Sequence, residues 1–254
     1  MKLFFSFFIF IISLIAPAQS YKVIYDVILN DIKTEAILFT DSEKALTVVK
    51  TKLTPSKTFD LNINVRDTFT FEKGDDIFFI KKDTVTADDI ILPNKYWVKE
   101  QLPSINIDSL NQDTAWFKFR GRKYIVKFDN TYNLPYGPLK FNGFPGLITE
   151  INTMSSNFFI NFKLKEIEEI DINWINLEKQ LLKIKEKPIQ YNKFINKLNL
   201  KLNNDIEILE SIESIHDLIK NPQLPIKVEV MENEKYEGYN SKWEKEMERI
   251  NDFL

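Results

Sequence analysis

Three pairs of adjacent acidic residues carry the clearest chemical potential in this sequence: Asp75-Asp76, Asp88-Asp89 and Glu168-Glu169. Two carboxylates that converge in space can hydrolyse a glycosidic bond or bind calcium. Adjacent residues on a strand point to opposite faces of a sheet, so none of these pairs converges by itself. We therefore expect the three pairs to lie in solvated turns, with a carboxylate-dependent hydrolase as an alternative.

Histidine and cysteine offer little further chemistry. His216 is the only histidine, and the sequence contains no cysteine. These counts exclude metal sites built from several histidines, thiol redox catalysis, and haem or iron–sulfur ligation through cysteine. They also leave a Ser-His-Asp triad poorly supported, and no phosphate-binding glycine loop or Gly-x-Ser-x-Gly elbow is present. The sequence thus predicts no catalytic residue, no metal ligand set and no cofactor.

A segment rich in glycine and proline, residues 136–151, is the most distinctive pattern of the chain. Asn142-Gly143 is a strong turn signal because both residues tolerate a positive φ, and Pro145-Gly146 suits the central positions of a type II turn. We expect two tight reversals, followed by a strand that starts at Leu147. The candidate binding residues of this motif are Gly137, Pro138, Gly143, Phe144, Pro145, Gly146, Leu147 and Ile148.

Two interpretations of the motif stay open. In the first, its glycines and prolines serve the backbone, which must turn twice and then pack closely. In the second, the amides near Gly143 and Gly146 form a concave donor cluster that receives an anion or a peptide carboxylate. The first interpretation makes the motif architectural, and the second makes it a binding site.

The run Gly137-Pro138, followed by Gly143-Phe144-Pro145-Gly146-Leu147-Ile148, resembles the signature of the GLPGLI family of exported proteins from Bacteroidetes-type bacteria. The resemblance is specific over residues 136–151 and weaker over 116–165. It implies a signal peptide, a β-rich body around the motif and no assigned biochemical role. The chain departs from the pattern at Phe144, where the family has leucine, and it lacks the upstream cysteine of many relatives.

Aromatic residues are concentrated in the strands expected around the motif. They could line a cavity for an apolar ligand, although aromatic residues in strands more often form ordinary core. Alternation fails at Phe158-Phe159, so both faces of the sheet would be apolar there. The aromatic residues are Trp116, Phe117, Phe119, Tyr124, Phe128, Phe158, Phe159 and Phe162.

The positions of these residues depend on a sheet, because apolar residues recur with a period close to two from Tyr21 to about Ile172. Short polar connections favour antiparallel pairing, with hairpins at Gly74-Asp75 and at 155–157. The first expected strand starts at Tyr21 and includes Asn30. The other expected strands are 35–40, 45–50, 68–73, 77–82, 116–120, 123–128, 147–153 and 158–164.

After Ile172 the period becomes that of a helix, with Leu177, Leu181 and Ile184 on one stripe that ends before Pro188. Further helices are expected at about 191–202, 205–220 and 243–250, with a strand at 226–231. The sequence predicts a single α+β domain over 19–254, sheet-rich over 19–172 and helix-rich over 173–254. We expect a curved, mainly antiparallel sheet with many hairpins, and C-terminal helices that cover one of its faces.

Residues 1–18 have the layout of a secretory signal peptide, with Lys2, an apolar run over 3–15 and Ala16-Pro17-Ala18 as the cleavage site. The run is too short to span a bilayer, and no later segment is apolar enough to do so. Without cysteine, a lipoprotein anchored through a processed N-terminal cysteine is excluded. We expect export to the periplasm or the cell exterior. The net charge of −3 argues against a nucleic-acid partner.

Three functions follow from these observations. The first is a non-enzymatic exported protein that binds an envelope component or is associated with the envelope. The second is a carrier or chaperone that shields a lipid or another apolar ligand inside a curved sheet, and the third is a carboxylate-dependent hydrolase. A flat apolar patch, a closed apolar cavity, or converging acids in a polar cleft would distinguish them.

Overall fold

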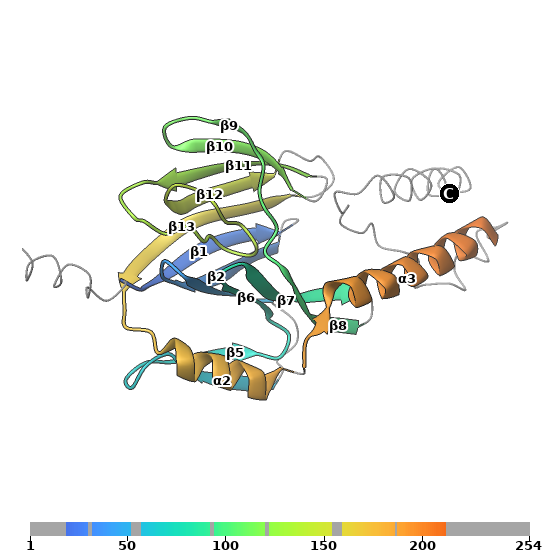
Figure 1. Cartoon of the computed structure of the whole chain (residues 1–254), viewed down its shortest axis with the longest axis horizontal. Helices are drawn as coiled ribbons and strands as arrows, with labels where there is room; N and C mark the ends of the chain where they lie inside the picture. The colour runs from blue at the N-terminus through green and yellow to red at the C-terminus, as the bar shows by residue number, and fades with distance from the viewer. Residues whose placement is uncertain are drawn as a thin grey trace, which may run out of the picture.

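The computed structural model describes residues 19–29, 32–51, 57–91, 94–119, 122–153, 159–185 and 187–211. Twelve of the strands within these residues form one large curved sheet, and two others form a separate small sheet (Figure 1). The strand order in the large sheet is β14-β8-β7-β6-β3-β2-β1-β13-β12-β11-β10-β9. Neighbouring strands are antiparallel, except that β14 pairs with β8 in parallel.

The strands of the large sheet are β1 (Tyr21–Leu29), β2 (Ile32–Thr40), β3 (Lys44–Val49), β6 (Asp76–Lys81), β7 (Thr84–Ile91), β8 (Asn94–Gln101), β9 (Ile107–Leu110), β10 (Thr114–Phe119), β11 (Arg122–Asp129), β12 (Leu147–Thr153), β13 (Ile160–Glu169) and β14 (Ile189–Gln190). The small sheet pairs β4 (Thr58–Asn62) with β5 (Thr68–Glu72). The helices are α2 (Trp174–Ile184) and α3 (Tyr191–Ser211).

Alternation along the strands gives the large sheet two different faces. On β1, Val23, Tyr25 and Val27 are buried on one face, whereas Ile24 packs into the core on the other. Residues 130–146, which we call the motif loop, pack on the side of Tyr25, and we call that side the loop face. The β4–β5 hairpin and α2 pack on the side of Ile24, which we call the hairpin face. The sheet therefore has an apolar core on each side.

Helix α2 begins with a side-chain cap, because Asn173 Oδ1 accepts a hydrogen bond from the backbone N–H of Asn176 at 3.1 Å. The apolar stripe predicted for this helix is confirmed, since Leu177 and Leu181 are buried in the core of the hairpin face. Helix α3 lies elsewhere and packs with Phe194 on β8. In the described chain, neither helix combines the length with the apolar character that crossing a membrane requires.

The predicted large antiparallel sheet is confirmed, and strand β12 has the predicted bounds 147–153. Strand β1 starts at Tyr21 as predicted and ends at Leu29. The hairpin predicted at Gly74-Asp75 is wrong, because β5 pairs with β4 while β6 pairs with β3 and β7. Gly74 and Asp75 do lie in a turn, but this turn connects β5 of the small sheet to β6 of the large sheet. The predicted break near 203–205 is also wrong, because α3 continues to Ser211.

Five strands were not predicted: β4, β7, β8, β9 and β14. Strands β7 and β8 contain charged residues at buried positions, with Asp88 and Glu100 among them, so the apolar period is interrupted. Several predictions lie outside the described residues, namely the signal peptide at 1–18, the turn at 155–157, Phe158, His216, the strand at 226–231 and the helix at 243–250.

Candidate functional site

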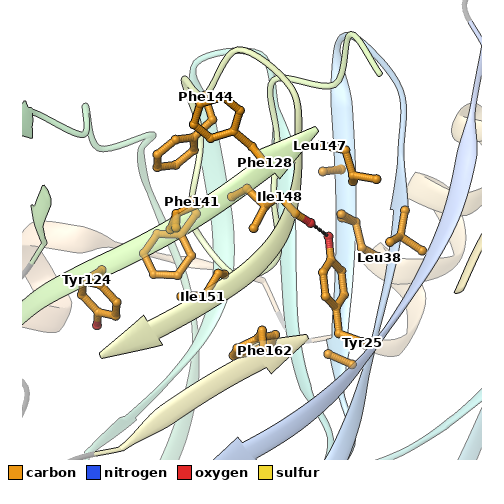
Figure 2. Close-up of a cluster of buried hydrophobic side chains, with 14 of the residues drawn as sticks. Tyr25, Leu38, Tyr124, Phe128, Phe141, Phe144, Leu147, Ile148, Ile151 and Phe162 are labelled. Atoms are coloured by element: carbon orange, nitrogen blue, oxygen red, sulfur yellow. Dashed lines mark hydrogen bonds between the residues drawn. The ribbon is translucent and has the colours of Figure 1, made fainter. Parts of the chain in front are cut away.

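The motif loop joins β11 to β12 and lies against the loop face (Figure 2). Two backbone hydrogen bonds fold it back on itself. The N–H of Gly137 donates to Phe141 O at 2.9 Å, and the N–H of Gly143 donates to Pro135 O at 2.9 Å. The amide of Gly143 is therefore used inside the loop, so it does not serve the donor cluster that the second interpretation of the motif requires.

Two glycines of the motif are needed for different physical reasons. Gly143 has a φ of +79° and open space around it, so it supplies a left-handed backbone. At Gly146 an added Cβ would lie 2.2 Å from Asp129 O and 2.6 Å from its carbonyl carbon. The type II turn predicted at Pro145-Gly146 is wrong, because Gly146 does not have the positive φ of that turn. Glycine instead lets the chain approach the end of β11 closely.

Phe141 and Phe144 anchor the motif loop in the core of the loop face (Figure 2). The ring centroid of Phe141 lies 5.1 Å from that of Tyr124 and 5.6 Å from that of Phe117, and both ring pairs are edge-to-face. The ring of Phe144 lies 5.4 Å from Phe117. Both loop phenylalanines are buried. The loop thus fills the space above the strands with its own side chains.

The core interpretation of the aromatic residues is confirmed for Phe117, Phe119, Tyr124, Phe128 and Phe162, which are all buried. Trp116 and Phe159 differ, because they are 39% and 42% exposed. Trp116 lies on the face of β10 opposite to its buried neighbour Phe117. The aromatic strands therefore form core on one face and present a partly exposed indole on the other.

Tyr25 connects β1 to the residues that follow the motif loop. Its buried hydroxyl donates a hydrogen bond to Ile148 O at 2.8 Å, which Figure 2 shows as a dashed line. Burial raises the pKa of the Tyr25 hydroxyl, which keeps it a neutral donor. Gly137 leaves room for the same residue, because a Cβ there would lie 2.2 Å from Ile148 Cδ1. The start of β12 is thus fixed from two sides.

Lys140 places a buried cation in the motif loop. Its Nζ lies 3.1 Å from Asp89 Oδ2 on β7 and 2.5 Å from Glu100 Oε1 on β8. The side chains of Lys140 and Glu100 are only 5% and 7% exposed. Charges of this kind depend on one another, because removing one of them takes a nearby opposite charge away from the others. We call these three residues the ion triad, and it ties the motif loop to two strands distant in sequence.

The predicted solvent exposure is wrong for two of the three acid pairs. Asp75 and Asp88 are buried, with 1% and 7% of their surface exposed. The carboxylate of Asp75 accepts hydrogen bonds from the backbone N–H groups of Glu72 and Thr51, at 2.8 and 3.0 Å. The Asp75 carboxylate therefore accepts hydrogen bonds from the backbone at the end of β5 and just after β3. Glu168 is half exposed as predicted, but Glu168 and Glu169 lie at the end of strand β13 and not in a turn.

Asp88 and Asp89 point to opposite faces, as expected for neighbours on a strand. Asp88 Oδ2 lies 2.7 Å from Lys185 Nζ, which follows α2 on the hairpin face. Asp89 belongs to the ion triad on the loop face. The two carboxylates therefore hold different elements to the sheet, α2 on one side and the motif loop on the other.

The arrangement of these acids suits structural cross-links better than catalysis. Burial raises the pKa of Asp76, and Lys95 Nζ at 2.6 Å from its Oδ1 opposes that rise. The charge of Asp88 also raises the pKa of Asp76, and Asp88 itself forms an ion pair with Lys185. Within the residues that the structure describes, no three side chains of histidine, cysteine, aspartate or glutamate converge as metal ligands.

Sequence reasoning located the motif but missed Lys140. The available signal was a lysine between Leu139 and Phe141, inside a segment that is otherwise apolar or turn-forming. Its partners Asp89 and Glu100 come from β7 and β8, two strands that were not predicted. Of the motif residues, Gly137, Pro138, Phe144, Gly146, Leu147 and Ile148 are buried, whereas Gly143 and Pro145 are exposed.

Two solved structures, both of PNGF-II and obtained in a C2 and in a P21 space group, are similar to this chain. They share 12% sequence identity with it, at TM-scores of 0.45 and 0.47. The similarity covers 72% of this chain but only 33% and 34% of those chains, so this chain spans about a third of their length. No family model matches the sequence, and no curated protein is significantly similar to it.

Proposed function

We propose that this protein is a non-enzymatic, exported binding protein of the cell envelope, with an α+β domain related to the GLPGLI proteins. The signal-peptide layout of residues 1–18 supports export, and the motif at 136–151 supports the kinship. In this proposal the motif maintains the fold, and the partner binds on a surface away from the motif loop.

One observation carries this proposal: the motif loop occupies the loop face with its own buried side chains. Phe141 and Phe144 contact the aromatic residues of the sheet, and Lys140 neutralises two acids. A ligand in the same place would have to displace two rings and separate a buried ion triad. Such a displacement would cost several kcal/mol, since breaking a buried ion pair alone costs about 3–5 kcal/mol.

The two rival functions have less support. A carrier needs an apolar cavity, but the aromatic side chains of the loop face are packed against one another and against the motif loop. A carboxylate-dependent hydrolase needs two acids that can exchange protons with a substrate. The buried acids Asp88 and Glu100 and the half-buried Asp89 instead lie against lysine ammonium groups.

Fractionation of cells that produce the full chain tests the proposed function. We expect the exported protein to sediment with isolated envelopes and to be released by high salt without detergent, because exposed ionic contacts are screened by salt. Protein found only in the fluid periplasm or the medium would contradict envelope association. A lipid-sized adduct in native mass spectrometry of the protein purified from its own envelope would favour the carrier instead.

A further inference from the structure

The hairpin face has a part that neither α2 nor the β4–β5 hairpin covers. It lies on β10 and β11, near the end of the sheet at the top of Figure 1. Trp116 and Lys118 of β10 lie there opposite Ile125 and Lys123 of β11. The two lysines are exposed, and the indole of Trp116 is 39% exposed. We call these four residues the tryptophan–lysine patch.

The two lysines are directly opposite each other on adjacent antiparallel strands. Residues directly opposite on antiparallel strands have Cβ atoms about 4.5–5.5 Å apart, and like charges at that distance destabilise a sheet. No carboxylate of the described chain pairs with Lys118 or Lys123. The positive charge of the patch is therefore available to a partner.

Other lysines on the same face are neutralised within the protein. Lys127 Nζ lies 2.8 Å from Glu150 Oε2, and Lys22 Nζ lies 3.2 Å from Glu168 Oε2. Lys165 Nζ lies 3.2 Å from Glu35 on β2. Among the described residues, these three lysines of the same face thus have acid partners that Lys118 and Lys123 lack.

The residues beside the patch are polar and lie in one row across the sheet. From Trp116 on β10, the row continues through Ile125 on β11 and Asn152 on β12 to Asn161 on β13. The Asn161 amide donates to Asn152 Oδ1 at 2.6 Å. Trp116 therefore offers a flat apolar surface with an N–H donor, next to a row of amides and two free ammonium groups.

We propose that the tryptophan–lysine patch binds an acidic polysaccharide, with a sugar ring stacked on Trp116 and an anionic group of the chain between Lys118 and Lys123. This inference rests on the proposed envelope-binding function and names its ligand class. The C–H face of a sugar fits the indole, its hydroxyl groups fit the amide row, and its acid group relieves the repulsion between the two lysines.

Two other anionic partners fit the patch less well. An anionic membrane would desolvate Asn152, Asn161 and the Lys127–Glu150 pair, which lie on the same face. A single-stranded nucleic acid stacks successive bases on several aromatic rings, whereas Trp116 is the aromatic side chain of this patch.

Native gel electrophoresis of the full chain in polymer-containing gels tests the proposal. We expect polygalacturonate or dextran sulfate to retard the protein, and neutral dextran to leave its mobility unchanged. The double change Lys118→Glu and Lys123→Glu should weaken binding at least tenfold, and Trp116→Ala should weaken it by about tenfold. The matched control Lys179→Glu and Lys183→Glu, at exposed positions of α2, should bind like the wild type.

A stability measurement separates loss of the site from loss of the fold. Lys118→Glu alone creates an opposite-charge pair with Lys123, so this variant should melt at or above the wild-type temperature while it loses binding. Equal retardation of the wild type and the double variant would overturn the proposal. The proposal would also be overturned if the acidic polymers retarded neither the wild type nor the double variant. Lysine-dependent binding to phosphatidylglycerol vesicles or to oligo-dT, without binding to either acidic polymer, would overturn it as well.

If the double variant fails to bind the polymers but still sediments with envelopes, the patch is a glycan site and a second contact holds the protein at the envelope. If neither acidic polymer binds while sedimentation persists, the proposed function stands without this ligand.

Discussion

Gly146→Ala should lower the free energy of unfolding by about 3 kcal/mol or more. The new Cβ would lie 2.2 Å from Asp129 O, 2.6 Å from the Asp129 carbonyl carbon and 2.9 Å from Asn130 Cα. All three atoms belong to the backbone, so no side-chain rotation can relieve the overlap. The expected result is a large decrease in the urea midpoint, measured by far-ultraviolet circular dichroism.

Gly143→Asn is the matched control for that change. Gly143 has a positive φ but no atom within 4 Å of an added Cβ, and asparagine tolerates a left-handed backbone. This variant should lose no more than about 1 kcal/mol. If Gly146→Ala were as stable as Gly143→Asn, the close approach to the end of β11 would not determine the need for glycine.

Lys140→Met should cost about 3–5 kcal/mol, because it leaves Asp89 and Glu100 without their shared cation in a buried place. Methionine retains most of the length of the side chain, so the loss reports the charge more than the packing. Urea denaturation of the purified variant measures this change in free energy.

A double change identifies the ion triad as the cause. Glu100→Gln combined with Lys140→Met should destabilise the protein by less than the sum of the two single changes, since one of the two carboxylates that shared Lys140 is then neutral. As a control, Lys127→Met removes a lysine whose pair with Glu150 is exposed, and it should leave the urea midpoint nearly unchanged. Strict additivity of the single changes would contradict coupling within the triad.

Local periodicity predicted the elements whose stability depends on a continuous apolar pattern. Strand β12 and helix α2 are examples, because Ile151, Leu177 and Leu181 mark their buried faces directly. Strand β7 was missed because Asp88 and Asp89 interrupt its pattern. The lysines that neutralise these acids, Lys140 and Lys185, are far away along the chain, and only the fold brings them near.

The motif shows the same limit at the level of single residues. The requirement for glycine at Gly143 follows from local turn chemistry and could be predicted from Asn142-Gly143. The requirement at Gly146 comes from the carbonyl of Asp129, and only the three-dimensional structure reveals this contact. The tryptophan–lysine patch was equally hidden, because it depends on which residues of β10 and β11 lie opposite each other.

Native-state hydrogen exchange at two amides of the motif loop tests most directly whether the loop is a permanent part of the core. Gly137 N–H and Gly143 N–H donate to carbonyls within the loop, so we predict that both exchange with an opening free energy within about 1 kcal/mol of global unfolding, like the amides of β1. Exchange of both amides through an opening several kcal/mol smaller, while β1 stays protected, would contradict the account. It would show a loop that lifts from the sheet and uncovers an apolar face for a ligand.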